Sequence, residues 1–181
     1  MNNEKYNKAV SRNLAELQWA IIHRTTLLGI EKVDNAYSYF LHSTYNGLFN
    51  DYIAHCIKVL EQRKGCASFW YIYRSNKKPV DSFAQERSID ISFLESVSKK
   101  LKLIRDKTHF HIDIEGVLNT EEIWRQADLK GNELADAVDA AWKILKHLQV
   151  SLDLPEVNLP SYSETNAKVA AEEAERASNK P

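Results

Sequence analysis

The part of the chain best equipped for chemistry is residues 101–115, which read LKLIRDKTHFHIDIE. Arg105 offers a fixed positive charge with fork geometry, which suits the oxygens of a phosphoryl group. His111 offers a group that moves protons near neutral pH. Cleavage of RNA needs these two groups and no metal when the 2′-hydroxyl is the nucleophile. The residue types therefore point to phosphate chemistry.

The same stretch contains alternating metal-ligand types, His109, His111 and Asp113. On a strand they would share one face and could bind zinc, as in metallo-hydrolases with an H-x-H-x-D-H motif. Ile114 stands where that motif has its last histidine. The surrounding pattern is helical, and residues two apart on a helix diverge by about 200°. We therefore expect neither a metal ion nor another cofactor at this stretch.

The separation of Arg105 and His111 sets a condition on the elements that carry them. On a straight α-helix two residues six apart lie about 120° from each other, so one helix face cannot hold both. The helix must end between them, or a second copy of the chain must complete the cleft. A simpler interpretation also stays open. Arg105 and Asp106 could end a helix and pair with local charges, without any catalytic role.

The remaining sequence predicts an all-α bundle of four to five main helices. Only 5 Gly and 4 Pro interrupt the 181 residues, which favours long helices. Apolar residues recur at helical spacing over 5–28, 35–63 and 132–149, and at Leu94, Val97, Leu101 and Ile104. Residues 66–75 are a short apolar run that the surroundings favour as helix, and residues 76–90 are expected to be a polar connection around Pro79. The helical domain is expected over 1–154. Residues 155–181 are expected to be a flexible tail, acidic and rich in Ala, or at most a solitary helix with no core to bind.

Charge and composition limit the classes of partner. The net charge is −1, which gives no global sign of nucleic-acid or membrane binding. Locally, residues 58–107 carry twelve Lys and Arg against six Asp and Glu, while residues 113–139 carry two bases against eight acids. This asymmetry is compatible with self-association, with anion binding, or with solvated polar faces. The chain has no run of about 18 apolar residues and no apolar leader, so we expect a cytoplasmic protein that binds no membrane.

Residues 105–111, RDKTHFH, resemble the motif of the HEPN superfamily. That motif is an arginine, a polar residue and a histidine after a further four to six residues. The acid directly after the arginine, and another acid two positions after His111, make the stretch most similar to the AbiU-type abortive-infection branch. The order of the helices agrees, because one long helix precedes the motif and another follows it. The resemblance covers residues 5–150 in the order of the helices. It is specific in the residues themselves over 101–113.

The resemblance implies a dimer in which the motifs of two protomers face each other. It implies a metal-independent endoribonuclease of prokaryotic defence or toxin type, with RNA as substrate and an antitoxin or defence protein as partner. Arg105 would stabilise the phosphate, His111 would act as general acid or base, and Asp106 would orient one of them. The residues expected to contact RNA are Lys102, Lys107 and His109. Some members of the superfamily are not nucleases, so the alternative is a non-catalytic module that binds a partner protein or nucleotide.

Overall fold

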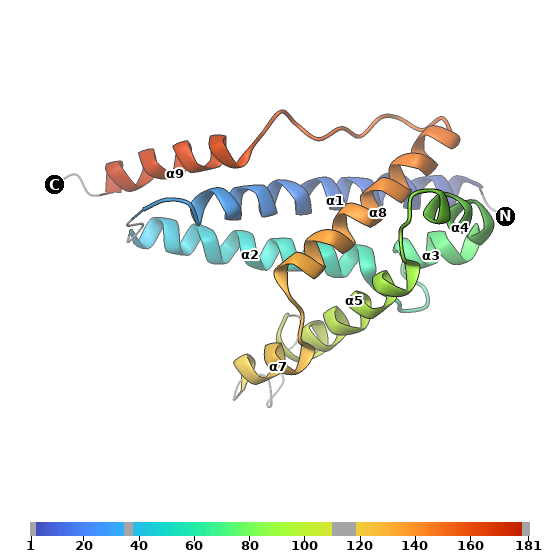
Figure 1. Cartoon of the computed structure of the whole chain (residues 1–181), viewed down its shortest axis with the longest axis horizontal. Coiled ribbons are helices and arrows are strands. Elements are labelled where there is room, and N and C mark those ends of the chain that lie inside the picture. Colours follow the sequence, from blue (N-terminus) through green and yellow to red (C-terminus); the bar gives the residue numbers. More distant parts are fainter. Residues whose placement is uncertain (1–2, 35–37, 110–118, 179–181) are drawn as a thin grey trace. The chain divides into compact units, whose positions relative to one another are not determined.

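The computed structural model describes residues 3–34, 38–109 and 119–178. Every regular element in these ranges is a helix, which confirms the predicted all-α bundle (Figure 1). None of the helices so described combines the length and the apolar content that a membrane span requires. The chain divides into two compact units, and the two longest helices, α1 (Asn3–Ile30) and α2 (Tyr39–Leu60), each contribute to both.

The first unit contains Met1–Leu17 and Cys56–Val157, and it carries the predicted motif. Its shorter elements are α3 (Phe69–Ser75), α4 (Lys77–Glu86), α5 (Ile91–Ile104), the π-helical turn η1 (Arg105–His109), α7 (Thr120–Ala127) and α8 (Gly131–Ser151). Helix α5 packs against α7 and α8, and α8 also packs against α4. The motif therefore follows directly from a helix that is fixed on two sides.

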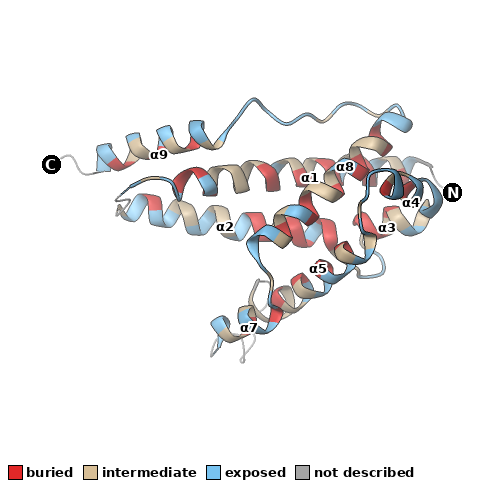
Figure 2. Cartoon of the chain, in the orientation of Figure 1, coloured by how far each residue is buried: buried red, intermediate tan, exposed pale blue. Residues whose placement is uncertain are grey.

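The predicted apolar stripes form the core of this unit. On α5 the four stripe residues are buried, and so are the five of α8: Leu94, Val97, Leu101 and Ile104, then Leu134, Val138, Ala141, Leu145 and Leu148. Figure 2 shows that both helices carry buried as well as exposed residues. The Asp90 side chain accepts a hydrogen bond from the backbone N–H of Ser92 at 2.7 Å and caps the start of α5. Burial and cap together fix where α5 begins and which way it faces.

The expectation of a polar connection over 76–90 is wrong, because most of this segment is α4. Pro79 is the third residue of that helix. A proline is tolerated in the first turn, where its missing N–H has no helical partner to lose. Val80 and Ala84, four residues apart, are buried and give α4 a narrow apolar face.

The second unit contains Gln18–His55 and Asn158–Pro181, and it corrects the expectation for the tail. The segment Glu164–Ser178 is a helix, α9, that buries Ala167, Ala171 and Glu175. Both carboxylate oxygens of Glu175 lie 3.1 Å from the backbone nitrogen of Ser38, which donates to them. Ala171 belongs to a small apolar cluster with residues of α1 and α2. The tail was expected to lack a core because the segment is polar and has no stripe of large apolar residues. Alanines at a spacing of four make only a weak apolar pattern.

The contact between α9 and α1 depends on Gly29. A Cβ atom on Gly29 would lie 2.8 Å from the carbonyl oxygen of Glu164 and 2.8 Å from the backbone nitrogen of Lys168. The two helices can approach this closely only because Gly29 has no side chain. Lys32 and Glu164 form an ion pair beside this contact.

Gly29→Ala is therefore expected to lower the free energy of unfolding by about 1–3 kcal/mol, the usual cost of overpacking. Gly47→Ala is the matched control, because a Cβ on Gly47 would meet nothing within 4 Å. The control should raise the free energy of unfolding by about 0.5–1 kcal/mol, since alanine favours a helix over glycine. Urea unfolding measures both changes. Equal stabilisation by the two variants would show that α9 is not held against Gly29.

Candidate functional site

The motif begins where α5 changes from an α-helix to a π-helical turn. The regular α-helix ends at Ile104, and η1 runs from Arg105 to His109. The sequence left two alternatives, a helix that ends between Arg105 and His111 or a second copy that completes the cleft. The α-helical part ends one residue before Arg105, and the π-helical turn continues to His109. The Thr108 hydroxyl donates to the carbonyl of Ile104 at 2.7 Å across this junction. Single π-helical turns are rare and occur frequently at functional sites.

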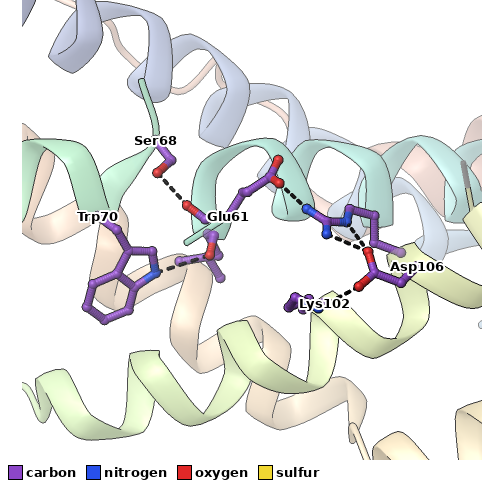
Figure 3. A network of polar contacts seen from close by, with 7 residues as sticks. Glu61, Ser68, Trp70, Lys102 and Asp106 are labelled. Atoms are coloured by element: carbon purple, nitrogen blue, oxygen red, sulfur yellow. Dashed lines mark hydrogen bonds and ion pairs between the residues drawn. The ribbon is translucent and has the colours of Figure 1, made fainter. Parts of the chain in front are cut away.

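Two carboxylates hold the guanidinium of Arg105. The first is Asp106, whose Oδ1 accepts from Arg105 Nε at 2.7 Å and also from Nη2. The second is Glu61, whose Oε1 accepts from Nη1. The Arg105 and Glu61 side chains are only 20% and 17% exposed, so this pair is less screened by water than a surface pair. Lys102 closes the network through a 2.6 Å ion pair with the other oxygen of Asp106 (Figure 3).

These contacts fix the charge states of the motif. Burial opposes ionisation of Asp106, but the hydrogen bonds from Lys102 and Arg105 outweigh it and lower the pKa of Asp106. Burial also disfavours the cation of Arg105, yet the hydrogen bond to Asp106 and the charge of Glu61 raise the pKa of Arg105. At neutral pH the pair is ionised, and Asp106 orients the arginine rather than moving a proton. The step of proton transfer therefore needs another residue.

Arg105 retains donors for a ligand despite these contacts. A guanidinium has five N–H groups. Three of them bond to Asp106 and Glu61, on Nε, Nη1 and Nη2. Among the residues that the structure describes, one N–H on each terminal nitrogen has no partner, and each of these groups can donate to a phosphoryl oxygen.

Glu61 lies just after the last residue of α2, and its backbone is fixed by two side chains. Ser68 donates its hydroxyl hydrogen to the carbonyl of Glu61 at 2.5 Å. The indole N–H of Trp70 lies 3.1 Å from the carbonyl of Leu60 and 2.9 Å from the hydroxyl of Ser98. These bonds satisfy carbonyls that the end of a helix leaves without partners. Figure 3 shows Ser68, Trp70 and Glu61 at the end of α2, with Lys102 and Asp106 on the neighbouring helix.

A pocket of about 240 Å³ opens beside this network. Its walls come from the end of α2 and from α5: Ile57, Leu60, Glu61, Gln62, Arg63, Ser98, Leu101, Lys102 and Arg105. Three of these residues are basic and one is acidic, and two of the bases, Lys102 and Arg105, are those paired with Asp106 and Glu61. No histidine is among its described walls. A group that moves protons near pH 7 would have to come from the segment after η1 or from a second copy of the chain.

The structure brings together three of the predicted site residues. Arg105, Asp106 and Lys102 form one network, whereas Lys107 lies in η1 with a partly exposed side chain. His109 is the last residue of η1. His111 lies outside the described residues, and so does Asp113 of the alternative metal motif. Within 3–34, 38–109 and 119–178, no three His, Cys, Asp or Glu side chains gather to hold a metal ion.

Sequence reasoning missed Glu61 as the partner of Arg105. The two residues are 44 positions apart, and an acid just after a helix has no distinctive pattern. Comparison with known proteins adds no further residue: no protein-family model, no curated protein and no solved structure matches this chain.

Proposed function

We propose that this chain is a metal-independent endoribonuclease of HEPN type that acts as a homodimer in prokaryotic defence. The observation that supports it best is the orientation of Arg105. Asp106, the acid directly after it, fixes the guanidinium beside a pocket with basic walls, and two of its N–H groups have no partner among the described residues. The π-helical turn at the same residues is a second observation that supports the proposal, because single π-helical turns occur frequently at functional sites.

In the proposed reaction the 2′-hydroxyl of RNA attacks the adjacent phosphorus. His111 of one protomer takes the hydroxyl proton as general base, and its equivalent in the second protomer donates a proton to the leaving 5′-oxygen. The remaining N–H groups of Arg105 stabilise the charge that develops on the phosphoryl oxygens. The P–O5′ bond breaks as the P–O2′ bond forms. The products are a 2′,3′-cyclic phosphate and a 5′-hydroxyl.

The test is cleavage of labelled RNA by the purified chain in EDTA. We expect cleavage without metal and products that end in 2′,3′-cyclic phosphate. DNA of the same sequence should resist, because it lacks the 2′-hydroxyl. Cleavage that requires a divalent metal, or products with a 5′-phosphate, would contradict the proposed chemistry.

Dimerisation is a separate prediction. The described pocket has no histidine, so a site completed by a second protomer would supply the missing group, and a two-fold axis would form two such sites. Light scattering at micromolar concentration is expected to report about twice the mass of one chain, which is 20.8 kDa. If a strictly monomeric species still cleaves RNA, the site is not shared between two protomers, and one chain carries out the reaction alone.

One observation favours a second candidate, a non-catalytic module that binds a partner protein or a nucleotide. Two carboxylates already occupy the guanidinium of Arg105, and a phosphate would have to compete with them. The pocket walls also include the apolar Ile57, Leu60 and Leu101. If the wild-type chain cleaves no RNA in EDTA or with added divalent metal, this module becomes the better proposal.

A further inference from the structure

A second pocket in the same unit has walls that fit an anion. Its volume is about 570 Å³. Helix α1 contributes Lys5, Lys8, Ala9 and Arg12, and the segment before and within α3 contributes Gly65, Cys66, Ala67 and Tyr71. No acidic residue is among these described walls. The three bases are three and four residues apart, so they lie along one face of α1.

The charges of these bases are only weakly neutralised. Lys8 and Arg12 pair with Glu4 and Glu16, but both bases are more than 70% exposed. The Lys8–Glu4 pair contributes little, because water screens both of its charges, whereas Glu16, the partner of Arg12, is only 9% exposed. Glu16 is also shared with Lys58 at 3.2 Å, so one acid faces two bases. Lys5 has no ion-pair partner among the residues that the structure describes.

One short segment forms part of both pockets. Residues 61–63 line the pocket at Arg105, and residues 65–67 line the pocket on α1. Arg63 and Lys64 are exposed bases within this segment. Its path is fixed by the bond from Ser68 to Glu61 and by Asn13, whose amide donates to the carbonyl of Ala67 at 2.6 Å. Bases therefore continue from α1 across this segment to α5.

We infer that these residues form a track for the phosphate backbone of a single RNA strand. The strand runs from Arg105 across residues 61–67 to the face of α1 that carries Lys5, Lys8 and Arg12, an inference that rests on the proposed function. The track explains how a chain with a net charge of −1 holds a polyanion. Tyr71 is the aromatic wall of the second pocket, where a base can stack on its ring. Contacts of this kind select a nucleic acid without reading its sequence.

The probe is a short, fluorescent 2′-O-methyl RNA, which keeps the phosphates but cannot be cleaved. Its Kd is measured at several salt concentrations for wild type and for the triple variant Lys5→Gln/Lys8→Gln/Arg12→Gln. The slope of log K against log salt is negative. Each lost phosphate contact reduces its magnitude by about 0.7 for a single strand, so three lost contacts should reduce it by about 2. If the two chains bind equally at about 1 M salt, the triple variant then binds about 100-fold more weakly at about 0.1 M.

Three exposed bases outside both pockets provide the matched control: Lys78→Gln/Lys99→Gln/Lys143→Gln. This control has the same change in net charge, and its salt slope should equal that of wild type. The single variant Lys5→Gln breaks no ion pair among the described residues. It should reduce the magnitude of the slope by about 0.7, and it guards against misfolding of the triple variant. A local readout is alkylation of Cys66, which bound RNA should slow. The other cysteine, Cys56, is fully buried and should not react.

The outcomes separate this inference from the proposed function. The track is overturned if wild type and the triple variant have equal salt slopes, or if the control variant loses as much slope as the triple variant. RNA cleavage by wild type would then still support the nuclease. Absence of RNA binding by wild type overturns the track as well. Binding that depends on α1 and protects Cys66, without any cleavage of unmodified RNA, supports the track and contradicts the nuclease.

Discussion

Replacing Arg105 by alanine is expected to reduce metal-independent RNA cleavage by about 10²–10³, the usual effect of losing one donor that stabilises developing charge. Replacing His111 by alanine is expected to reduce it by about 10²–10⁴, because a group that transfers protons is lost. The measurement is the rate of cleavage of labelled RNA in EDTA. Helicity and dimer mass should stay unchanged in both variants.

A structural role of Arg105 must be separated from a catalytic one, since its removal leaves Glu61 without its cation. Arg105→Lys is the first control: it keeps a positive charge near Glu61 but loses the planar fork. Arg105→Ala/Glu61→Gln is the second, and it removes the carboxylate charge that would be left alone. Both variants should fold as wild type and should remain almost inactive. Recovery of cleavage in the double variant would show that Arg105 acts only by holding Glu61, and cleavage by Arg105→Lys would show that a positive charge is enough without the planar fork.

The order of the two histidines is the sharpest part of this prediction. His109→Ala should cost much less activity than His111→Ala, because the spacing of His109 from Arg105 is too short for the motif. The reverse order would show that the assignment of His111 is wrong even if the chain is a nuclease. Equal loss in both would indicate that each has a role, one of them in binding RNA.

The long helices were predictable because their cores use large aliphatic residues at helical spacing. The sequence predicted helices over 5–28 and 132–149, and the structure has Asn3–Ile30 and Gly131–Ser151. Small or sparse apolar residues gave too weak a pattern elsewhere. Helix α4 buries only Val80 and Ala84, and α9 is held by alanines against a glycine. Such close contacts depend on the partner surface, which a local pattern does not contain.

The candidate site was predictable only where its residues are adjacent in sequence. Arg105 and Asp106 are neighbours, so their pairing follows from the motif itself. Glu61 comes to Arg105 through tertiary packing, and a local pattern carries no information on such a contact. The bases on α1 were visible in principle, because Lys5, Lys8 and Arg12 share one helix face. Their proposed role in RNA binding depends on residues 65–67, which line the same pocket. Only the structure places those residues beside α1.

Trp70→Ala is expected to lower the free energy of unfolding by about 3–5 kcal/mol, the range for truncating a large buried aromatic side chain. Trp70 is 5% exposed, and its ring packs edge-on against Phe69 with centroids 5.3 Å apart. Trp19→Ala is the matched control. The Trp19 side chain is 51% exposed, so much less apolar surface is lost from the folded state. Urea unfolding of both variants gives the comparison, and a similar loss in the two would contradict the burial of Trp70.

Trp70→Phe separates the hydrogen bonds of the indole from its packing. Phenylalanine retains most of the apolar contact but removes the N–H that reaches Leu60 and Ser98. Ser98 keeps its own bond to the carbonyl of Leu94 at 2.8 Å, so the carbonyl of Leu60 is the group left without this donor. A buried polar group without a partner costs about 1–3 kcal/mol, and we expect a loss of stability in that range. Because Leu60 precedes Glu61, the same variant should loosen the wall that holds Arg105 and weaken binding of the uncleavable RNA. Wild-type stability and RNA binding in Trp70→Phe would show that packing alone positions the end of α2.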